Sequence, residues 1–172
     1  MRLNVAMVTA PEEFIFKIPN GFVLVQDTRE QRPLFDGTVA IPGLTVVNAA
    51  LVSGDYSVRG FEGRFCIERK QISDFFSYIG KERNRTTRKM QEFQEIASRG
   101  GFVALVIEAS EVDLLSGYVM SQLSPEMVRQ ALVSFEVRSG LHIYYSRSRQ
   151  DITRWILDRA IKFYKIQREV KS

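Results

Sequence analysis

The sequence has little of what several classes of protein require: one cysteine, one histidine and no long hydrophobic run. The lone Cys66 excludes an intrachain disulfide framework and a cysteine-based zinc site, which favours a reducing, cytoplasmic compartment. The lone His142 excludes any mechanism that needs two histidines, and we interpret it as a packing or surface residue. No stretch approaches the ~18 apolar residues of a membrane span, and residues 1–14 lack the pattern of an export signal. We therefore expect no membrane association.

The composition is that of an ordinary folded domain. With 172 residues, of which 45% are hydrophobic and 26% charged, the chain can bury one sizeable core but not two. We predict a single domain over residues 1–172, with an N-terminal extension at 1–20 and a core at about 21–168. The net charge of +4 is modest, but basic residues gather at 81–89 and from 147 to 171.

Strand patterns and helix patterns alternate along the chain. Apolar or β-branched runs at 21–27, 44–58, 63–70, 102–108 and 141–146 predict strands, and the turn at 60–63 predicts a hairpin between 44–58 and 63–70. Helices are predicted from about Ser73, with a break near Gly80, then from Ser124 to Gly140 and from about Asp151 onward. This order predicts an α/β fold with a central mixed β-sheet flanked by helices. In such sheets ligands bind where strands end, and both Asp27 and Glu108 end apolar strands.

Three consecutive charges, Glu68, Arg69 and Lys70, end an otherwise apolar strand. Side chains two apart on a strand share a face, so Glu68 and Lys70 project together while Arg69 points the other way. Asp55 follows a glycine on the paired strand and is expected within reach of Glu68. One interpretation is an exposed strand edge without a function. The apolar lead-in and the nearby second carboxylate instead favour a catalytic site.

A divalent cation would relieve the conflict between two carboxylates in a partly desolvated place. Carboxylate oxygens suit Mg²⁺ or Mn²⁺, and the backbone carbonyl of Arg69 can supply another oxygen ligand. Lys70 would then stand beside a metal-bound water, where an ammonium group can orient that water or help to deprotonate it. The residue types therefore fit phosphodiester hydrolysis.

The segment KERNRTTRK at 81–89 has two interpretations. Blocks of positive charge are usually solvated faces of helices. Positive charge at the start of a helix opposes the helix dipole, however, and bound phosphates would supply the missing anions. We expect this segment to contact DNA, through the basic residues Lys81, Arg83, Arg85, Arg88 and Lys89.

Three short motifs, DTRE at 27–30, GDY at 54–56 and ERKQISD at 68–74, occur in the order and at the intervals of the XPF-type structure-selective endonucleases. The chain resembles this family from about Phe22 to the final helix, and it is most similar to the short single-domain members of bacteria and phages. The resemblance implies a restriction-endonuclease-like fold and metal-dependent cleavage of DNA, with Mg²⁺ or Mn²⁺ as cofactor. It implies these catalytic residues: Asp27, Asp55, Glu68 and Lys70. Of these, Asp55 and Glu68 would be metal ligands with Asp27 as a further acid near the metal, and the site would be supported by Arg29, Glu30, Arg69 and Asp74.

Three functions remain open at this level. The first is an active endonuclease on branched DNA, such as a flap or a junction, in repair, recombination or replication. The second is a non-catalytic DNA-binding or scaffold subunit, although the presence of all four catalytic residues favours catalysis. The third is an RNA-processing nuclease on the same fold. A partner protein could supply recognition of the DNA structure.

A homodimer is also expected. The last helix carries a broad apolar stripe that includes Ile152, Trp155, Ile156, Phe163 and Ile166. Most of such a stripe would cover the sheet, and the remainder could form a two-fold contact between copies. The resemblance favours the same arrangement, because nuclease domains of the family pair through their own surfaces.

Overall fold

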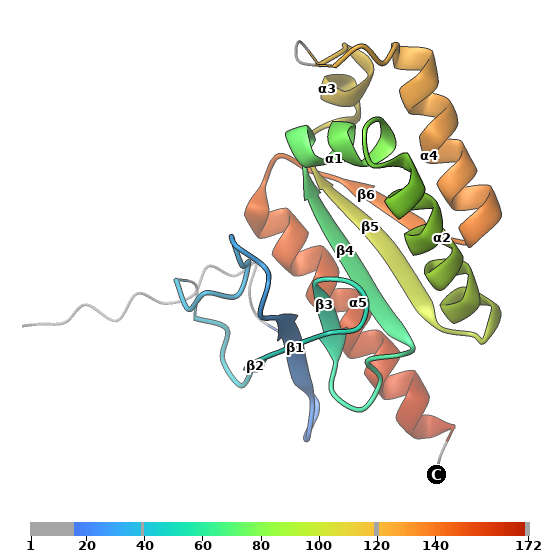
Figure 1. The fold of residues 1–172 in the computed structure, drawn as a ribbon. Coiled ribbons are helices and arrows are strands. Elements are labelled where there is room, and N and C mark those ends of the chain that lie inside the picture. The colour runs from blue at the N-terminus through green and yellow to red at the C-terminus, as the bar shows by residue number, and fades with distance from the viewer. Residues whose placement is uncertain (1–15, 39, 119–120, 171–172) are drawn as a thin grey trace, which may run out of the picture.

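One six-stranded sheet forms the centre of the computed structural model, which describes residues 16–38, 40–118 and 121–170 (Figure 1). Its strands are β1 (Val23–Asp27), β2 (Thr45–Ala49), β3 (Tyr56–Val58), β4 (Phe65–Gln71), β5 (Phe102–Glu108) and β6 (His142–Tyr145). They lie side by side in the order β2-β1-β3-β4-β5-β6. The predicted α/β fold with a mixed sheet is confirmed.

The strand directions bring five carboxyl ends to one end of the sheet. β1 is parallel to β2 and antiparallel to β3, and β3 is antiparallel to β4. β4, β5 and β6 are parallel to one another, so β1, β2, β4, β5 and β6 all run the same way. The end of β1, the end of β4 and the start of β3 are therefore neighbours. This arrangement places Asp27, Asp55 and Glu68 in one region.

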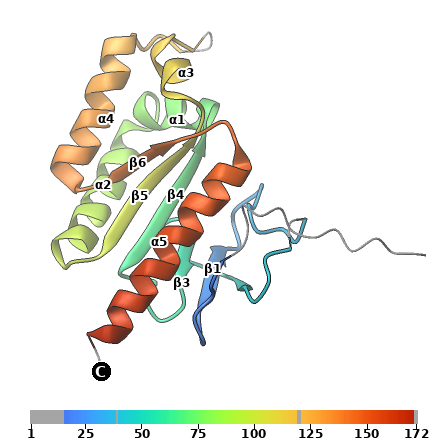
Figure 2. The ribbon, with the colours of Figure 1, turned by 180° about the vertical axis from the view of Figure 1, so that it is seen from behind.

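Helices cover both faces of the sheet, as Figures 1 and 2 show from opposite sides. The helices are α1 (Ile72–Ile79), α2 (Arg83–Ser98), α3 (Glu111–Leu115), α4 (Pro125–Ser139) and α5 (Arg149–Glu169). α5 packs on one face, while α1, α2 and α4 pack on the other. Within β4, Ile67 belongs to the core on the α5 side and Cys66 to the core on the opposite side, as the strand alternation requires. Both side chains are fully buried, which agrees with a packing role for Cys66.

The predicted single strand at 44–58 is wrong in detail. Its first part, β2, is an edge strand beside β1, and only β3 forms the predicted hairpin with β4. The two parts are separated by a loop in which Gly54 has a φ of +78° and lies against β4, where a Cβ atom would come within 2.9 Å of the Ile67 carbonyl oxygen. A β-branched run cannot continue as a strand through such a conformation.

The helix predictions agree more closely. The break near Gly80 separates α1 from α2, and α4 begins at Pro125 with Ser124 as its N-cap, accepting a hydrogen bond from the Met127 amide. α5 begins two residues earlier than predicted because Ser148 caps it. The short helix α3 was not predicted, although Ser110 and Asp113 form a capping box.

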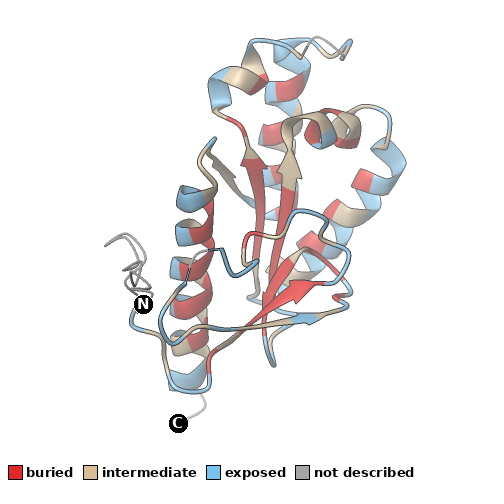
Figure 3. Cartoon of the chain, turned by 90° about the vertical axis from the view of Figure 1, so that its left-hand side faces the viewer, coloured by how far each residue is buried: buried red, intermediate tan, exposed pale blue. Residues whose placement is uncertain are grey.

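Most of the apolar stripe of α5 packs against the core of the same chain. Figure 3 shows the inner side of this helix buried along its length, and Ile152 and Ile156 are fully buried against the sheet. Trp155 and Phe163 are only partly covered, and Ile166 is 42% exposed. Of the predicted N-terminal extension at 1–20, residues 1–15 lie outside the described residues. Phe16, which follows, packs against the α5-side core.

Among the described helices, none is both long enough and apolar enough to span a membrane.

Candidate active site

The centre of the site is a pair of carboxylates held on neighbouring strands. Asp55 immediately precedes β3, and its Oδ2 accepts a hydrogen bond of 2.7 Å from the backbone amide of Arg69 in β4. Its own amide donates to the Ile67 carbonyl at 2.8 Å. Because the N–H and C=O of a strand residue point to the same side, the Arg69 carbonyl oxygen also faces the side on which Asp55 lies. Two carboxylates and one backbone oxygen thus gather at the end of β4.

Glu68 and Lys70 project from the same face of β4, as their spacing predicts. Lys70 Nζ lies 2.6 Å from Glu68 Oε1, and both side chains are largely buried. The ammonium group also lies 5.3 Å from the ring centroid of Tyr78 in α1, a favourable cation–π contact. Burial alone lowers the pKa of Lys70, but the neighbouring Glu68 raises it overall. Lys70 is therefore a fixed ammonium group beside the carboxylates.

The two carboxylates carry more negative charge than Lys70 can offset. Burial, and after it the nearby charge of Glu68, raise the pKa of Asp55 to about 7, although the Arg69 amide works in the opposite direction. A nearby cation would stabilise the charged form of Asp55. Oxygen ligands from carboxylates and a carbonyl are the donors that Mg²⁺ and Mn²⁺ prefer. The residues present therefore fit a hard divalent cation.

Asp27 lies next to this pair in the sheet, because its amide donates to the Asp55 carbonyl at 2.8 Å. Its carboxylate, however, is fully engaged: Oδ1 accepts from the Arg29 amide and Nε, and Oδ2 accepts from Arg29 Nη2 and from the Leu51 amide. The hydrogen bond from the Arg29 side chain holds the pKa of Asp27 at about 2. Among the described residues, no group of three or more histidine, cysteine or acidic side chains is arranged to hold a metal. Asp27 holds Arg29 in place beside the pair formed by Asp55 and Glu68.

A buried ion-pair network supports the opposite face of β4. Arg69 pairs with Glu30 at 3.0 Å and with Glu108 at 2.8 Å. Sequence reasoning placed Glu108 at a strand end but missed Arg149, the first residue of α5. Arg149 pairs with Glu108 at 3.0 Å and donates to the Pro33 carbonyl at 2.7 Å. No local pattern could have indicated it, because its partners lie 41 and 116 residues away.

The basic segment surrounds the start of α2, as predicted. A hollow there is lined by Lys81, Glu82, Arg83, Asn84, Arg85, Arg88, Lys89 and Glu92. The first turn of α2 contains no acidic residue, and the N-cap Glu82 makes no capping bond but pairs with Arg85 at 3.0 Å. Lys81, Arg83, Arg85 and Arg88 are exposed.

Lys89 stands apart from the other basic residues of this segment. Its Nζ lies 3.1 Å from Glu92 and donates to Ser53 Oγ at 3.1 Å. The side chain is only 21% exposed. It therefore fixes the loop before Asp55 rather than presenting a free charge to solvent.

Asp74, predicted to support the site, and His142, predicted to have a packing or surface role, lie outside the contacts described above. Asp74 is exposed in the first turn of α1, and the hydrogen bond that the structure gives it is a long one from Ser73 Oγ, at 3.4 Å. His142 stacks on Phe102 at the edge of the sheet, with ring centroids 4.8 Å apart, which agrees with a packing role.

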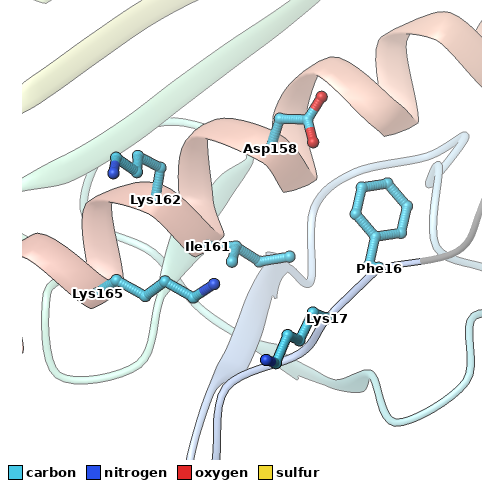
Figure 4. Close-up of a pocket in the computed structure, with 6 residues that line it drawn as sticks. All are labelled: Phe16, Lys17, Asp158, Ile161, Lys162 and Lys165. Carbon is cyan, nitrogen blue, oxygen red and sulfur yellow. The ribbon is translucent and has the colours of Figure 1, made fainter.

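A second hollow lies between the N-terminal segment and α5, on the other face of the sheet (Figure 4). It is lined by Phe16, Lys17, Asp158, Ile161, Lys162 and Lys165. This hollow accounts for part of the positive charge of the C-terminal helix. None of the residues predicted for the active site lines it.

The architecture is that of an XPF-type nuclease domain. The family model of the ERCC4 domain matches residues 26–158, and the chain belongs to this family. Among solved structures, it is similar to XPF from Aeropyrum pernix, with a TM-score of 0.60, 18% identity and coverage of 80% of this chain and 59% of that chain. XPF from Aeropyrum pernix in complex with DNA matches with a TM-score of 0.58 and 16% identity, over 84% of this chain and 65% of that chain. These matches show a shared fold, and the chain spans less than two thirds of either XPF chain. A search of curated proteins found no match.

Proposed function

We propose that this protein is a divalent-metal-dependent endonuclease that hydrolyses phosphodiester bonds in branched DNA. The proposal rests on the position of Asp55, Glu68 and Lys70 together at one strand end, where Lys70 contacts Glu68. The Arg69 amide fixes the Asp55 carboxylate there with a hydrogen bond of 2.7 Å. Membership of the ERCC4 domain family and the similarity to an XPF structure solved with DNA support the choice of DNA as substrate.

Asp55, Glu68 and the Arg69 carbonyl would hold Mg²⁺ or Mn²⁺. When bound there, the metal would lower the pKa of a water molecule and neutralise charge on the phosphate. Asp27 would act beside it as the acid that orients Arg29, since its own oxygen atoms already accept four hydrogen bonds. The Arg29 side chain is 70% exposed and would be available to a phosphate.

Lys70 would position the attacking water and offset charge that develops on the phosphate. Its contact with Glu68 and with the Tyr78 ring holds the ammonium group in place before substrate binds, so little reorganisation is needed. The exposed basic residues at the start of α2 would bind phosphates on the flanking DNA. Binding and chemistry would thus use separate residues.

A cleavage assay tests the proposal directly. The protein would be incubated with flap, fork, four-way junction, plain duplex and RNA substrates, each in Mg²⁺ and in EDTA. Metal-dependent cleavage of branched DNA is expected, with less cleavage of plain duplex and none of RNA. Binding without cleavage would indicate instead a scaffold subunit, and cleavage of RNA alone would indicate an RNA-processing enzyme.

The working assembly is also part of the proposal. We infer a homodimer in the cytoplasm, with the option of a partner protein that adds recognition of the DNA structure. The buried, unpaired thiol of Cys66 suits a reducing compartment.

A further inference from the structure

The loop of residues 50–55, between β2 and β3, is anchored at both sides next to the active site. On one side, the Leu51 amide donates to Asp27 Oδ2 at 2.7 Å, and Arg29 Nη2 donates to the Leu51 carbonyl at 2.6 Å. Leu51 is itself buried, at 5% exposure. This side of the loop is therefore tied to the DTRE motif.

The other side of the loop is tied to α2 and β4. Lys89 Nζ donates to Ser53 Oγ, and Ser53 Oγ donates to Glu92 Oε2, both at 3.1 Å. Gly54 then packs so closely on β4 that a side chain there would collide with Cys66 Sγ and the Ile67 carbonyl. The loop is thus fixed immediately before the metal-binding Asp55.

Val52 projects into solvent between these two anchors. It is 97% exposed, more than any other large hydrophobic residue that the structure describes. Single exposed apolar residues are common and need no explanation by themselves. Here, however, the residues on both sides are buried and hydrogen-bonded, so the loop cannot turn to cover the valine. A rigidly presented apolar group loses little conformational entropy when it binds a partner.

The position of Val52 limits what that partner can be. It lies three positions before Asp55 in the chain, so the two Cα atoms lie within about 11 Å. Arg29 stands on one side of the loop, and the basic hollow at the start of α2 ends at Lys89 and Glu92 on the other. A DNA strand held by both basic groups with its phosphate at Asp55 would run along this loop, on which Val52 is the exposed apolar side chain.

We propose that Val52 packs against an unstacked base or sugar next to the cleaved phosphate and thereby favours branched DNA over continuous duplex. The inference rests on the proposed function and adds a residue that determines substrate structure. In continuous duplex, an apolar side chain can reach a base only by unstacking it, which costs a few kcal/mol per step. At a branch or an unpaired end most of that cost is absent. Only branched substrates would therefore gain from burying the valine.

The test compares cleavage of flap and plain duplex DNA of identical sequence at the cleavage point. Val52→Ser should lower the ratio of flap to duplex cleavage rates about tenfold, the loss expected when burial of one valine is removed. Val52→Ile keeps an apolar side chain and should retain the wild-type ratio. Val137→Ser is the matched control, because Val137 is 79% exposed on α4 and should leave both rates unchanged.

A second measurement does not depend on cleavage. A 2-aminopurine base at the branch point should brighten when wild-type protein binds in EDTA, and Val52→Ser should lose most of this signal. An unchanged flap-to-duplex ratio, or an equal loss on both substrates, would overturn the inference while leaving the nuclease assignment intact. If the wild-type protein cleaves no DNA in Mg²⁺, the proposed function fails and the inference with it.

Discussion

The backbone amide of Arg69 donates a 2.7 Å hydrogen bond to the carboxylate of Asp55, so the strand that carries Glu68 also fixes the second acid of the site. The relationship couples the two motifs GDY and ERK through a single contact between strands. Because the contact comes from the backbone, it does not depend on any side chain of β4. Substitutions at Glu68 or Lys70 can therefore change the chemistry while leaving Asp55 in place.

Asp55→Asn and Glu68→Gln should each lower DNA cleavage by at least about a hundredfold. DNA affinity should remain nearly unchanged, because the flanking phosphate contacts are made by other residues. Single-turnover cleavage and fluorescence anisotropy measure the two properties separately. Glu62→Gln, an exposed position in the β3–β4 turn, is the matched control. Full activity in either site variant would remove that residue from the metal site.

The metal-free protein should lose stability as the pH rises from about 4 to about 7. Asp55 has a raised pKa in the folded state, so the folded protein keeps a proton that the unfolded chain has already lost. The loss should reach about 4 kcal/mol in EDTA and should disappear in Mg²⁺. Urea unfolding of wild type and Asp55→Asn over this pH range measures the difference. An identical pH dependence in both proteins would contradict a raised pKa at this residue.

The double substitution Arg85→Ala with Arg88→Ala should flatten the salt dependence of DNA binding. Each lost phosphate contact reduces the slope of log K against log salt by about 0.9, which anisotropy between about 50 and 200 mM salt can resolve. Lys162→Ala with Lys165→Ala removes the same charge from the hollow beside α5 and serves as control (Figure 4). If only the control pair changes the slope, DNA runs over the other face of the protein.

Tyr78→Phe should raise the free energy of unfolding by about 1 kcal/mol. The Tyr78 hydroxyl is buried and has no hydrogen-bond partner among the residues that the structure describes, so its removal relieves an unsatisfied group. The ring and its contact with Lys70 remain in this variant. Tyr78→Leu, which removes the ring, should instead destabilise the protein. A loss of stability in Tyr78→Phe would mean that the hydroxyl has a bonding partner.

At micromolar concentration, light scattering should report twice the 19.8 kDa mass of one chain. With Ile152 and Ile156 buried in the core, the contact is left to Trp155, Phe163 and the half-exposed Ile166. Ile166→Glu should shift the protein to monomer, whereas Val137→Glu on α4 should not. Monomer mass at every concentration, with full cleavage activity, would show that one chain is the working unit.

Properties that depend on neighbours along the chain could be predicted from the sequence. Strand alternation was enough to place Glu68 and Lys70 on one face and Arg69 on the other. Helix periodicity was enough to predict that Ile152 and Ile156 are buried, but not that Trp155 and Phe163 are only partly covered. Contacts between residues distant in the chain depend on the tertiary structure. The sequence predicted Asp27 as an acid near the metal but could not show that the Leu51 amide, 24 residues away, donates to its carboxylate. The sequence also could not show that Lys89 donates to Ser53, 36 residues away. Hydrogen bonds form only when atoms come within about 3 Å, and no periodic pattern encodes how a loop brings distant residues that close.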